Sequence, residues 1–324
     1  MGSFYIAAGC VIFWRSADGR QQAGHGIEGM KTLTERTLGF IGLGLMGRPM
    51  CLNLHAAGAR MIIHNRSRDK AEQLVRPGIE TAATPAAVAR RADTIVLMVS
   101  DTPAVEEVLF GAQGVIHGLQ DNALLIDMGT TAAVATRDFA ARIRQAGADY
   151  IDAPVSGGDI GAIDATLTIM AGGEASAIQR AGPIFDVLGA SFTHVGSVGA
   201  GQVAKAANQV IVGLNIGAVA EAFALVRSAG VDPAKVRQAL MGGFAASRIL
   251  EVHGQKMIDR NFKPGAKVTT QYKDMSQAIE LGALHGQALP ATELNRTLYK
   301  SLIDRGQGNL DHSALIKALR DDFE

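Results

Sequence analysis

The chain has 324 residues, which is enough for about two domains that each bury a core. It carries 31 Lys and Arg against 31 Asp and Glu, so the formal net charge is zero and no strongly basic surface exists for nucleic acid or an anionic membrane. Two cysteines are too few for a disulfide scaffold or a cysteine zinc site, and the histidines lack HxH or HExxH spacing, so we expect no metal site.

Residues 1–35 are expected to form a tail or an upstream extension outside the folded domains. Phe4–Trp14 is apolar but shorter than the ~20 residues that span a bilayer, and no Lys or Arg precedes it as in a signal peptide. Ser16–Gly29 is polar and glycine-rich, and Met30 is the expected natural start. Because nothing else suggests export, we expect a cytoplasmic protein.

From Arg36 onward, short apolar runs alternate with glycine turns and helical stretches. Helix formation is predicted for Arg48–Ala57, with Pro49 in the first turn, where a missing N–H costs little. Strands are predicted at Leu38–Ile41, Met61–Ile63, Thr94–Met98, Leu124–Asp127, Asp149–Asp152, Leu167–Met170 and Ser191–His194. Continuous apolar strands between helices predict a parallel sheet that is covered on both faces.

The pattern changes after Val198. Gly201–Ala229 contains no proline and has apolar residues at helical spacing, which predicts a helix about 43 Å long. Most of the remaining chain is also expected to be helical, with breaks at Gly230, Gly242–Gly243, Pro264–Gly265 and Gly306. We therefore predict an α/β domain over residues 36–196 and an all-α domain over residues 197–324, joined by the long inter-domain helix.

A GxGxxG motif follows the first predicted strand and opens a helix. It consists of Gly42, Leu43, Gly44, Leu45, Met46 and Gly47. In this βαβ context the first glycine permits the turn, the second lets the backbone approach a pyrophosphate, and the third allows close helix–strand packing. The motif predicts a Rossmann domain that binds a nicotinamide dinucleotide.

The end of the second predicted strand bears on the choice between NAD and NADP. An Asp or Glu at this place binds the ribose 2′-hydroxyl and repels a 2′-phosphate. This sequence has the neutral Asn65, followed by Arg66 and Ser67, which can pair with a phosphate and donate a hydrogen bond. The sequence therefore favours NADP(H), with NAD(H) as the alternative.

Three motifs in this order resemble the β-hydroxyacid dehydrogenase family. They are the glycine motif continued through Met50, the segment DAPVSGG at Asp152–Gly158, and GQVAKAAN at Gly201–Asn208. The resemblance covers about residues 37–320. It implies an NAD(P)-dependent enzyme that interconverts a small semialdehyde acid and its hydroxy acid, and that forms a homodimer or homotetramer.

The resemblance assigns the catalytic role to Lys205. An ammonium can protonate the carbonyl oxygen as hydride reaches the carbon, and desolvation beside a nicotinamide lowers the pKa of a lysine toward working pH. Asn208, three residues later, shares the helical face of Lys205 and is expected to orient the lysine or the substrate hydroxyl.

The resemblance also implies which residues bind the substrate. Ser156, Gly157 and Gly158 correspond to a carboxylate-binding loop, whose glycines leave backbone N–H groups unobstructed. Gly129 stands where relatives commonly have a serine implicated in substrate contact, so its backbone N–H would have to substitute.

Further cofactor contacts are implied for residues that follow other predicted strands and for one residue of the helical domain. These are Val99, Ser100, Thr130 and Lys273. Asp274 is expected to help hold Lys273 or Lys205.

The substrate remains open within the family. The segments Asn261–Gly265, Ala206–Val212 and Asp311–Leu315 most resemble tartronate semialdehyde reductases, which reduce 2-hydroxy-3-oxopropionate to D-glycerate. Asn65–Ser67 and Val99–Asp101 instead resemble NADPH-dependent glyoxylate/succinic semialdehyde reductases. 3-Hydroxyisobutyrate dehydrogenase is a further alternative.

Two alternatives come from other functional classes. One is a non-catalytic NADP-binding module and the other is an imine reductase. The presence of Lys205 argues against both.

Overall fold

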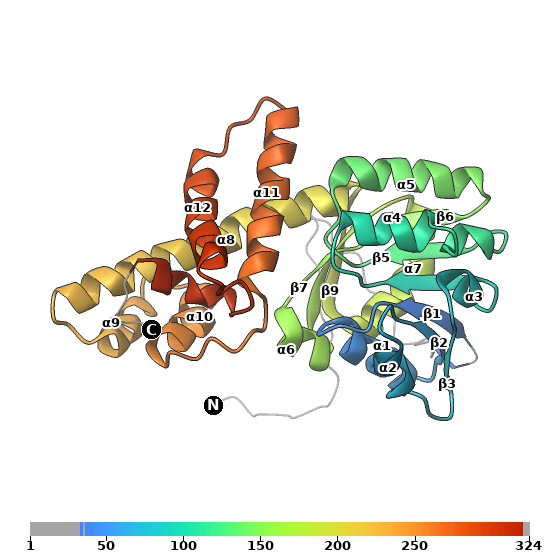
Figure 1. Ribbon diagram of the computed structural model, residues 1–324, viewed down its shortest axis with the longest axis horizontal. Helices are drawn as coiled ribbons and strands as arrows, with labels where there is room; N and C mark the ends of the chain where they lie inside the picture. The colour runs from blue at the N-terminus through green and yellow to red at the C-terminus, as the bar shows by residue number, and fades with distance from the viewer. Residues whose placement is uncertain (1–32, 35, 320–324) are drawn as a thin grey trace, which may run out of the picture.

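The computed structural model describes residues 33–34 and 36–319. The expected tail and the expected start at Met30 lie outside the described residues, except for the short stretch just before the first strand. An α/β domain and a helical domain lie side by side, and one long helix runs from the first into the second (Figure 1). The predicted fold class is therefore confirmed.

A nine-stranded sheet forms the centre of the α/β domain. Its strands are β1 (Thr37–Ile41), β2 (Arg60–His64), β3 (Ile79–Thr81), β4 (Thr94–Leu97), β5 (Leu124–Asp127), β6 (Asp149–Asp152), β7 (Val155–Ser156), β8 (Leu167–Gly172) and β9 (Gly189–Gly196). The order is β3-β2-β1-β4-β5-β6-β8-β7, and β9 pairs with β8. The apolar runs predicted seven of these strands, whereas β3 and β7 are too short to stand out in the sequence.

The larger part of the sheet is parallel, as predicted, but an antiparallel strand, whose direction the apolar runs did not indicate, is added to it. Strands β3, β2, β1, β4, β5 and β6 are parallel to one another, whereas β8 pairs antiparallel with both β6 and β7. Strand β9 is parallel to β8, and most of its residues are partly or fully exposed. The orientation of β8 follows from the chain path, because only a short helix separates β7 from β8.

Two apolar layers cover the parallel part of the sheet. Successive strand residues alternate between them: Ile95 and Leu97 of β4 belong to one core, and Val96 belongs to the other. The core of Val96 contains residues of α1 (Gly47–Ala56), α6 (Gly158–Ile163) and α7 (Ala175–Leu188). The core of Ile95 and Leu97 contains residues of α3 (Pro85–Ala89), α4 (Thr102–Phe110) and α5 (Ala133–Gln145). Helix α2 (Arg68–Glu72) and the 3₁₀ helix η1 (Val115–His117) complete this domain.

Helix α8 (Ala200–Ser228) is the inter-domain helix and begins and ends within one residue of the predicted bounds. The helical domain packs around its later turns with α9 (Pro233–Leu240), α10 (Arg248–Ile258), α11 (Val268–Leu284), α12 (Pro290–Asp304) and the 3₁₀ helix η2 (His312–Ala318). Gly213 and Gly217 of α8 bring α11 and α12 close, because a Cβ at these positions would lie 2.8 Å from Gln271 and 2.8 Å from Asn295.

By length and composition alone, α8 is apolar enough to cross a membrane. Its buried face nevertheless carries Gln202, Lys205 and Gln209, which make polar contacts in both domains. A long apolar helix is also expected where two domains pack against the same helix, because both of them bury part of its surface.

Candidate active site

The glycine motif forms a tight loop between β1 and α1. Gly42 has φ +103°, and a Cβ there would lie 2.3 Å from the carbonyl oxygen of Met98. A Cβ on Gly47 would lie 1.9 Å from the carbonyl oxygen of Gly42, so this position requires close backbone packing. Gly44 is exposed, and a Cβ there would meet nothing within 4 Å. The loop therefore has two structural glycines and one that leaves open backbone at the start of α1, which fits a bound pyrophosphate.

The other residues of the motif have distinct environments. Leu43 is buried at 3% exposure, Leu45 is exposed, and Met46 packs against the core that contains the buried residues of α1.

Asn65 joins the end of β2 to the glycine loop. Its Oδ1 accepts a hydrogen bond from the backbone N–H of Leu43 at 2.8 Å, and its Nδ2 donates to the carbonyl oxygen of Ser67 at 2.9 Å. The amide thus shapes the loop, while Arg66 and Ser67 remain exposed beside it. These two side chains are available to a ligand that lies along the loop.

Lys273 links the helical domain to the ends of two strands. Its Nζ donates to the carbonyl oxygen of Ser100 at 2.8 Å and to that of Thr130 at 3.4 Å. It also lies 3.3 Å from Oδ1 of Asp274. Ser100 follows β4, next to the half-buried Val99, and Thr130 follows β5. Lys273 and Ser100 thus meet in the structure although more than 170 positions separate them in the sequence.

Lys205 is buried at the junction of the two domains, with 8% of its surface exposed. Its Nζ donates to the carbonyl oxygen of Val155 at 2.7 Å. Burial lowers the pKa of Lys205 below its ordinary value, the Lys273 charge acts in the same direction, and the Asp274 charge opposes both. A buried ammonium with a lowered pKa gives up its proton more readily than an exposed lysine does.

The expected carboxylate loop adjoins this lysine, since Ser156 follows Val155 directly. Gly157 and Gly158 have φ values of +133° and +64°, and a Cβ on Gly158 would meet nothing within 4 Å. Asn208 is half-buried on α8, and its Nδ2 donates to Oε1 of Gln209 at 2.8 Å. Its side chain therefore contacts its helical neighbour rather than the Lys205 ammonium.

Gly129 is not free to offer its N–H group as expected. That N–H donates to Oδ1 of Asp127 at 3.0 Å, and the Gly129 carbonyl oxygen accepts from Nε2 of Gln202 at 3.0 Å. Oε1 of Gln202 also accepts from the backbone N–H of Thr131. Gln202 thus fixes the segment after β5 to α8. The sequence predicted no role for this glutamine, although it lies in the GQVAKAAN motif.

Asp127 anchors the same segment from β5. Its fully buried carboxylate accepts from Oγ1 of Thr131 at 2.6 Å and from the Tyr150 hydroxyl at 3.0 Å. Burial raises the pKa of Asp127, against the lowering effect of these hydrogen bonds.

Asp152 holds the beginning of α8. Its carboxylate accepts from the backbone N–H of Gly199 at 2.7 Å and from that of Gln202 at 2.8 Å. The aspartate replaces the local cap that the first turn lacks, and it fixes the turn that leads to Lys205. Burial raises the pKa of Asp152 to about 6, and the nearby Asp127 charge acts in the same direction.

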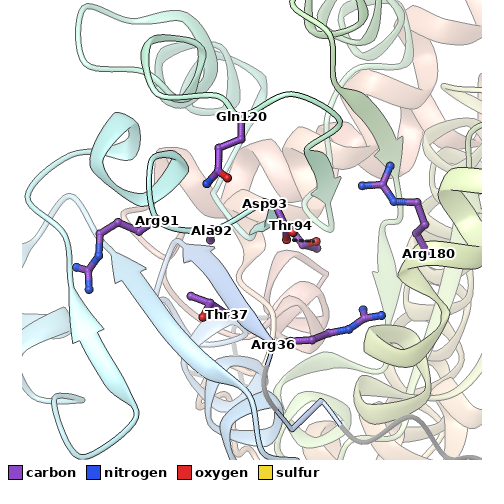
Figure 2. A pocket seen from close by; sticks show the side chains of 8 residues that line it. All are labelled: Arg36, Thr37, Arg91, Ala92, Asp93, Thr94, Gln120 and Arg180. Atoms are coloured by element: carbon purple, nitrogen blue, oxygen red, sulfur yellow. Dashed lines mark hydrogen bonds between the residues drawn. The ribbon is translucent and has the colours of Figure 1, made fainter.

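A cavity of about 470 Å³ lies at the amino ends of the strands, on the side of the sheet away from the glycine loop. Figure 2 shows its lining near the starts of β1 and β4, including Arg36, Thr37, Thr94 and Arg180. The glycine loop follows the other end of β1, so this cavity is separate from the motif residues. Arg180 is already paired with Asp149 at 2.8 Å.

Three potential metal ligands cluster in the helical domain, which the histidine spacing did not reveal. They are His253, Asp311 and His312, whose donor atoms lie within 4.8 Å of one another. Oδ2 of Asp311 accepts from the Lys256 ammonium at 2.9 Å, and Oδ1 accepts from Ser313 Oγ at 2.6 Å. Because the carboxylate is already saturated by donors and an ammonium, the cluster fits a structural ion-pair network better than a cation site.

Two family models match the chain in succession. The model described as the NAD binding domain of 6-phosphogluconate dehydrogenase matches residues 37–196. The model described as NAD-binding of NADP-dependent 3-hydroxyisobutyrate dehydrogenase matches residues 199–319.

Known proteins resemble the chain over nearly the whole described region. It is 45% identical over 282 residues to 2-hydroxy-3-oxopropionate reductase of Escherichia coli K12, with 87% of this chain and 96% of that protein covered. The structure of Mycobacterium tuberculosis 3-hydroxyisobutyrate dehydrogenase with L-serine has a TM-score of 0.79 at 28% identity, covering 88% of this chain and 99% of that one. The structure of Psf3 in complex with NADP+ and 2-OPP has a TM-score of 0.80 at 26% identity, covering 87% and 100%. Given the open glycine loop, the buried lysine and this similarity, the chain belongs to the β-hydroxyacid dehydrogenase family of NAD(P)-dependent oxidoreductases.

Proposed function

We propose that the protein reduces 2-hydroxy-3-oxopropionate (tartronate semialdehyde) to D-glycerate with a nicotinamide cofactor. The observation that carries the proposal is the buried Lys205, whose Nζ lies at the domain junction beside the Ser156 loop. The 45% identity to the E. coli 2-hydroxy-3-oxopropionate reductase supports this substrate.

The cofactor, when bound, supplies hydride to the carbonyl carbon. Gly42, Gly44 and Gly47 would hold its pyrophosphate at the start of α1, and Val99, Ser100 and Thr130 line the neighbouring strand ends. Lys273 would fix those strand ends, because its ammonium already binds the carbonyl oxygens of Ser100 and Thr130.

The chain's own residues then bind the substrate and move the proton. Ser156, Gly157 and Gly158 would bind the carboxylate through a hydroxyl and exposed backbone N–H groups. The Lys205 ammonium donates a proton to the carbonyl oxygen as it becomes an alkoxide, and Asn208 orients the substrate hydroxyl. Gly129 supports this site through its backbone hydrogen bonds to Asp127 and Gln202 instead of contacting the substrate.

We propose NADP(H) as the preferred cofactor. The exposed Arg66 and Ser67 lie beside the glycine loop through the Leu43–Asn65 hydrogen bond, and the end of β2 carries no carboxylate to repel a 2′-phosphate.

We also propose a homo-oligomer in which a second copy covers apolar side chains of the helical domain. Ile211 and Leu225 of α8 are 61% and 71% exposed, Phe244 is fully exposed, and α9 has no buried residue. Light scattering that gives the monomer mass at micromolar concentration would reject this part of the proposal.

Initial rates test the reaction directly. The purified protein is given tartronate semialdehyde, succinic semialdehyde, glyoxylate or 3-hydroxyisobutyrate, each with the NADP and the NAD form of the cofactor. The proposal predicts the highest kcat/KM for tartronate semialdehyde with NADPH. Faster turnover of succinic semialdehyde or glyoxylate would favour the alternative that Asn65–Ser67 and Val99–Asp101 support, and faster turnover with NADH would overturn the cofactor preference.

A further inference from the structure

Gln209, one helical turn after Lys205, fastens the buried carboxylate of Asp274. Its Nε2 donates to Oδ2 of Asp274 at 2.6 Å and lies 3.2 Å from Oε1 of Gln271. Gln209 is 8% exposed and Asp274 is 3% exposed, so water has little access to this contact. A buried carboxylate that keeps its charge needs such donors.

Gln271 in turn fixes the orientation of Gln209. Its Nε2 donates to the backbone carbonyl oxygen of Gln209 at 3.1 Å, so the two glutamines bind each other through side chain and backbone. A Cβ at Gly213 would lie 2.8 Å from Nε2 of Gln271, so the glycine provides the room for this amide.

His312 continues the row behind Gln271. Its Nδ1 lies 3.4 Å from Oε1 of Gln271, and its Nε2 lies 3.3 Å from Nε2 of His253. Burial lowers the pKa of His312 to about 3, so the ring is neutral near pH 7. Because Oε1 of Gln271 only accepts, Nδ1 of His312 carries the hydrogen and Nε2 accepts from His253. Oε1 of Gln271 therefore accepts from His312 on one side and from Nε2 of Gln209 on the other, and the remaining N–H of Gln209 donates to Asp274.

The charge at the end of this row bears directly on Lys205. Two charged groups of α11 act on the lysine: Asp274 raises its pKa, and Lys273 lowers it together with burial. His312, which contacts Gln271, is neutral and adds no further charge. If the Asp274 carboxylate turned away, burial and the Lys273 charge would favour the neutral amine, and only the Val155 carbonyl oxygen would still stabilise the ammonium.

We propose that Gln209 is a positioning residue that keeps the Asp274 carboxylate oriented toward Lys205, and that Gln271 and His312 hold Gln209 in that role. The proposal rests on the function proposed above, in which the Lys205 ammonium is the proton donor. The expected consequence is that the row sets the pH range in which the enzyme reduces its substrate.

The test replaces Gln209 by methionine, which keeps the length of the side chain but removes the donor. Reduction requires the ammonium, so kcat/KM falls as pH rises through the pKa of Lys205. In Gln209→Met we expect this alkaline limb to move to lower pH by about half to one unit, because the attraction of Asp274 is weakened. Gln271→Met should shift the alkaline limb in the same direction without altering α8. This second variant replaces Gln209→Met in the test if Gln209→Met does not fold.

Asn295→Leu is the matched control. Asn295 is a buried amide whose Nδ2 donates to the Gly213 carbonyl oxygen of α8 at 2.6 Å, and it makes no hydrogen bond to Asp274. It should lower thermal stability as Gln209→Met does but leave the alkaline limb in place. Equal pH profiles for Gln209→Met and Asn295→Leu would overturn the proposal.

A titration without substrate separates this proposal from the proposed function. The ¹³Cε shift of Lys205, assigned by its loss in Lys205→Met, is followed with pH in the wild type and in the variants. We expect its midpoint to be lower in Gln209→Met than in the wild type. An unchanged midpoint rejects the role of Gln209 even if the enzyme is active, whereas a shifted midpoint in a protein that reduces no semialdehyde supports it and rejects only the proposed function.

Discussion

The Lys205 ammonium donates a hydrogen bond to the carbonyl oxygen of Val155 at 2.7 Å, which ties the start of α8 to β7. This contact places the buried charge one residue from Ser156 and gives it a polar partner. The carbonyl dipole stabilises the ammonium, while burial favours the neutral amine. An acid that has to give up its proton during turnover requires this kind of balance.

Lys205→Met should abolish reduction while cofactor binding persists. The methionine fills the same space without a proton to donate, and loss of a general acid costs about 10²- to 10⁴-fold in kcat. Cofactor affinity, measured by nicotinamide fluorescence, should stay at the wild-type value because the glycine loop lies on a different element. Wild-type turnover in this variant would reject the role of Lys205 as the general acid.

Gly44→Ala tests the glycine loop. A Cβ at Gly44 meets no protein atom within 4 Å, so the folded protein should tolerate it. A pyrophosphate bound against the open backbone would meet that methyl group, and we expect at least about a tenfold rise in the Kd for NADPH with no change in Tm.

Gly182→Ala is its control, because Gly182 lies in α7 and a Cβ there also meets nothing. This variant should keep wild-type affinity and gain slightly in Tm from helix propensity. Equal affinities in both variants would contradict the assignment of Gly44 to the cofactor.

Arg66→Ala addresses the cofactor preference. If the guanidinium binds a 2′-phosphate, its loss removes a charge-assisted hydrogen bond worth about 1.5–3 kcal/mol, or roughly 10- to 100-fold in affinity. The Kd for NADPH should rise by that factor and the Kd for NADH should stay constant, as measured by titration calorimetry. A parallel loss of both affinities would show that Arg66 does not discriminate between the cofactors.

The sequence predicted those parts of the molecule that depend on local patterns. The apolar runs located the main strands, the absence of proline located α8, and the motif context located the glycine loop. The antiparallel β8 was missed because strand direction depends on how the chain returns after β7, which apolar content does not report.

The supporting polar contacts of the site could not be predicted in the same way. Asp152 accepts from the N–H of Gly199, 47 residues later, where α8 begins, and Gln209 meets Asp274 across 65 residues. Asp and Gln at such separations have no characteristic spacing. Only the packing of α8 against β6 and α11 brings them together, and the same packing places Gln202 against the carbonyl oxygen of Gly129.

Asp152→Asn tests the capping contact and its pH dependence. Burial raises the pKa of Asp152 from its ordinary 3.8 to about 6, so the folded state binds this proton more tightly than the unfolded state. The wild-type protein should therefore lose stability as pH rises from about 4 to about 6, by roughly 3 kcal/mol from this group. The asparagine does not titrate, so the decrease in Tm between pH 5 and pH 7 should be smaller in the variant.

At pH 5 the wild-type carboxyl is largely protonated, so the same variant should match its stability to within about 1 kcal/mol, since the protonated oxygen, like the amide nitrogen, is a poor acceptor for the N–H at the start of α8. Asp127, whose pKa is also raised, is present in both proteins and cancels in the comparison. Thermal unfolding of both proteins at the two pH values measures the difference. Parallel pH dependence would mean that Asp152 remains charged at little cost, and that its two hydrogen bonds to Gly199 and Gln202 outweigh its burial.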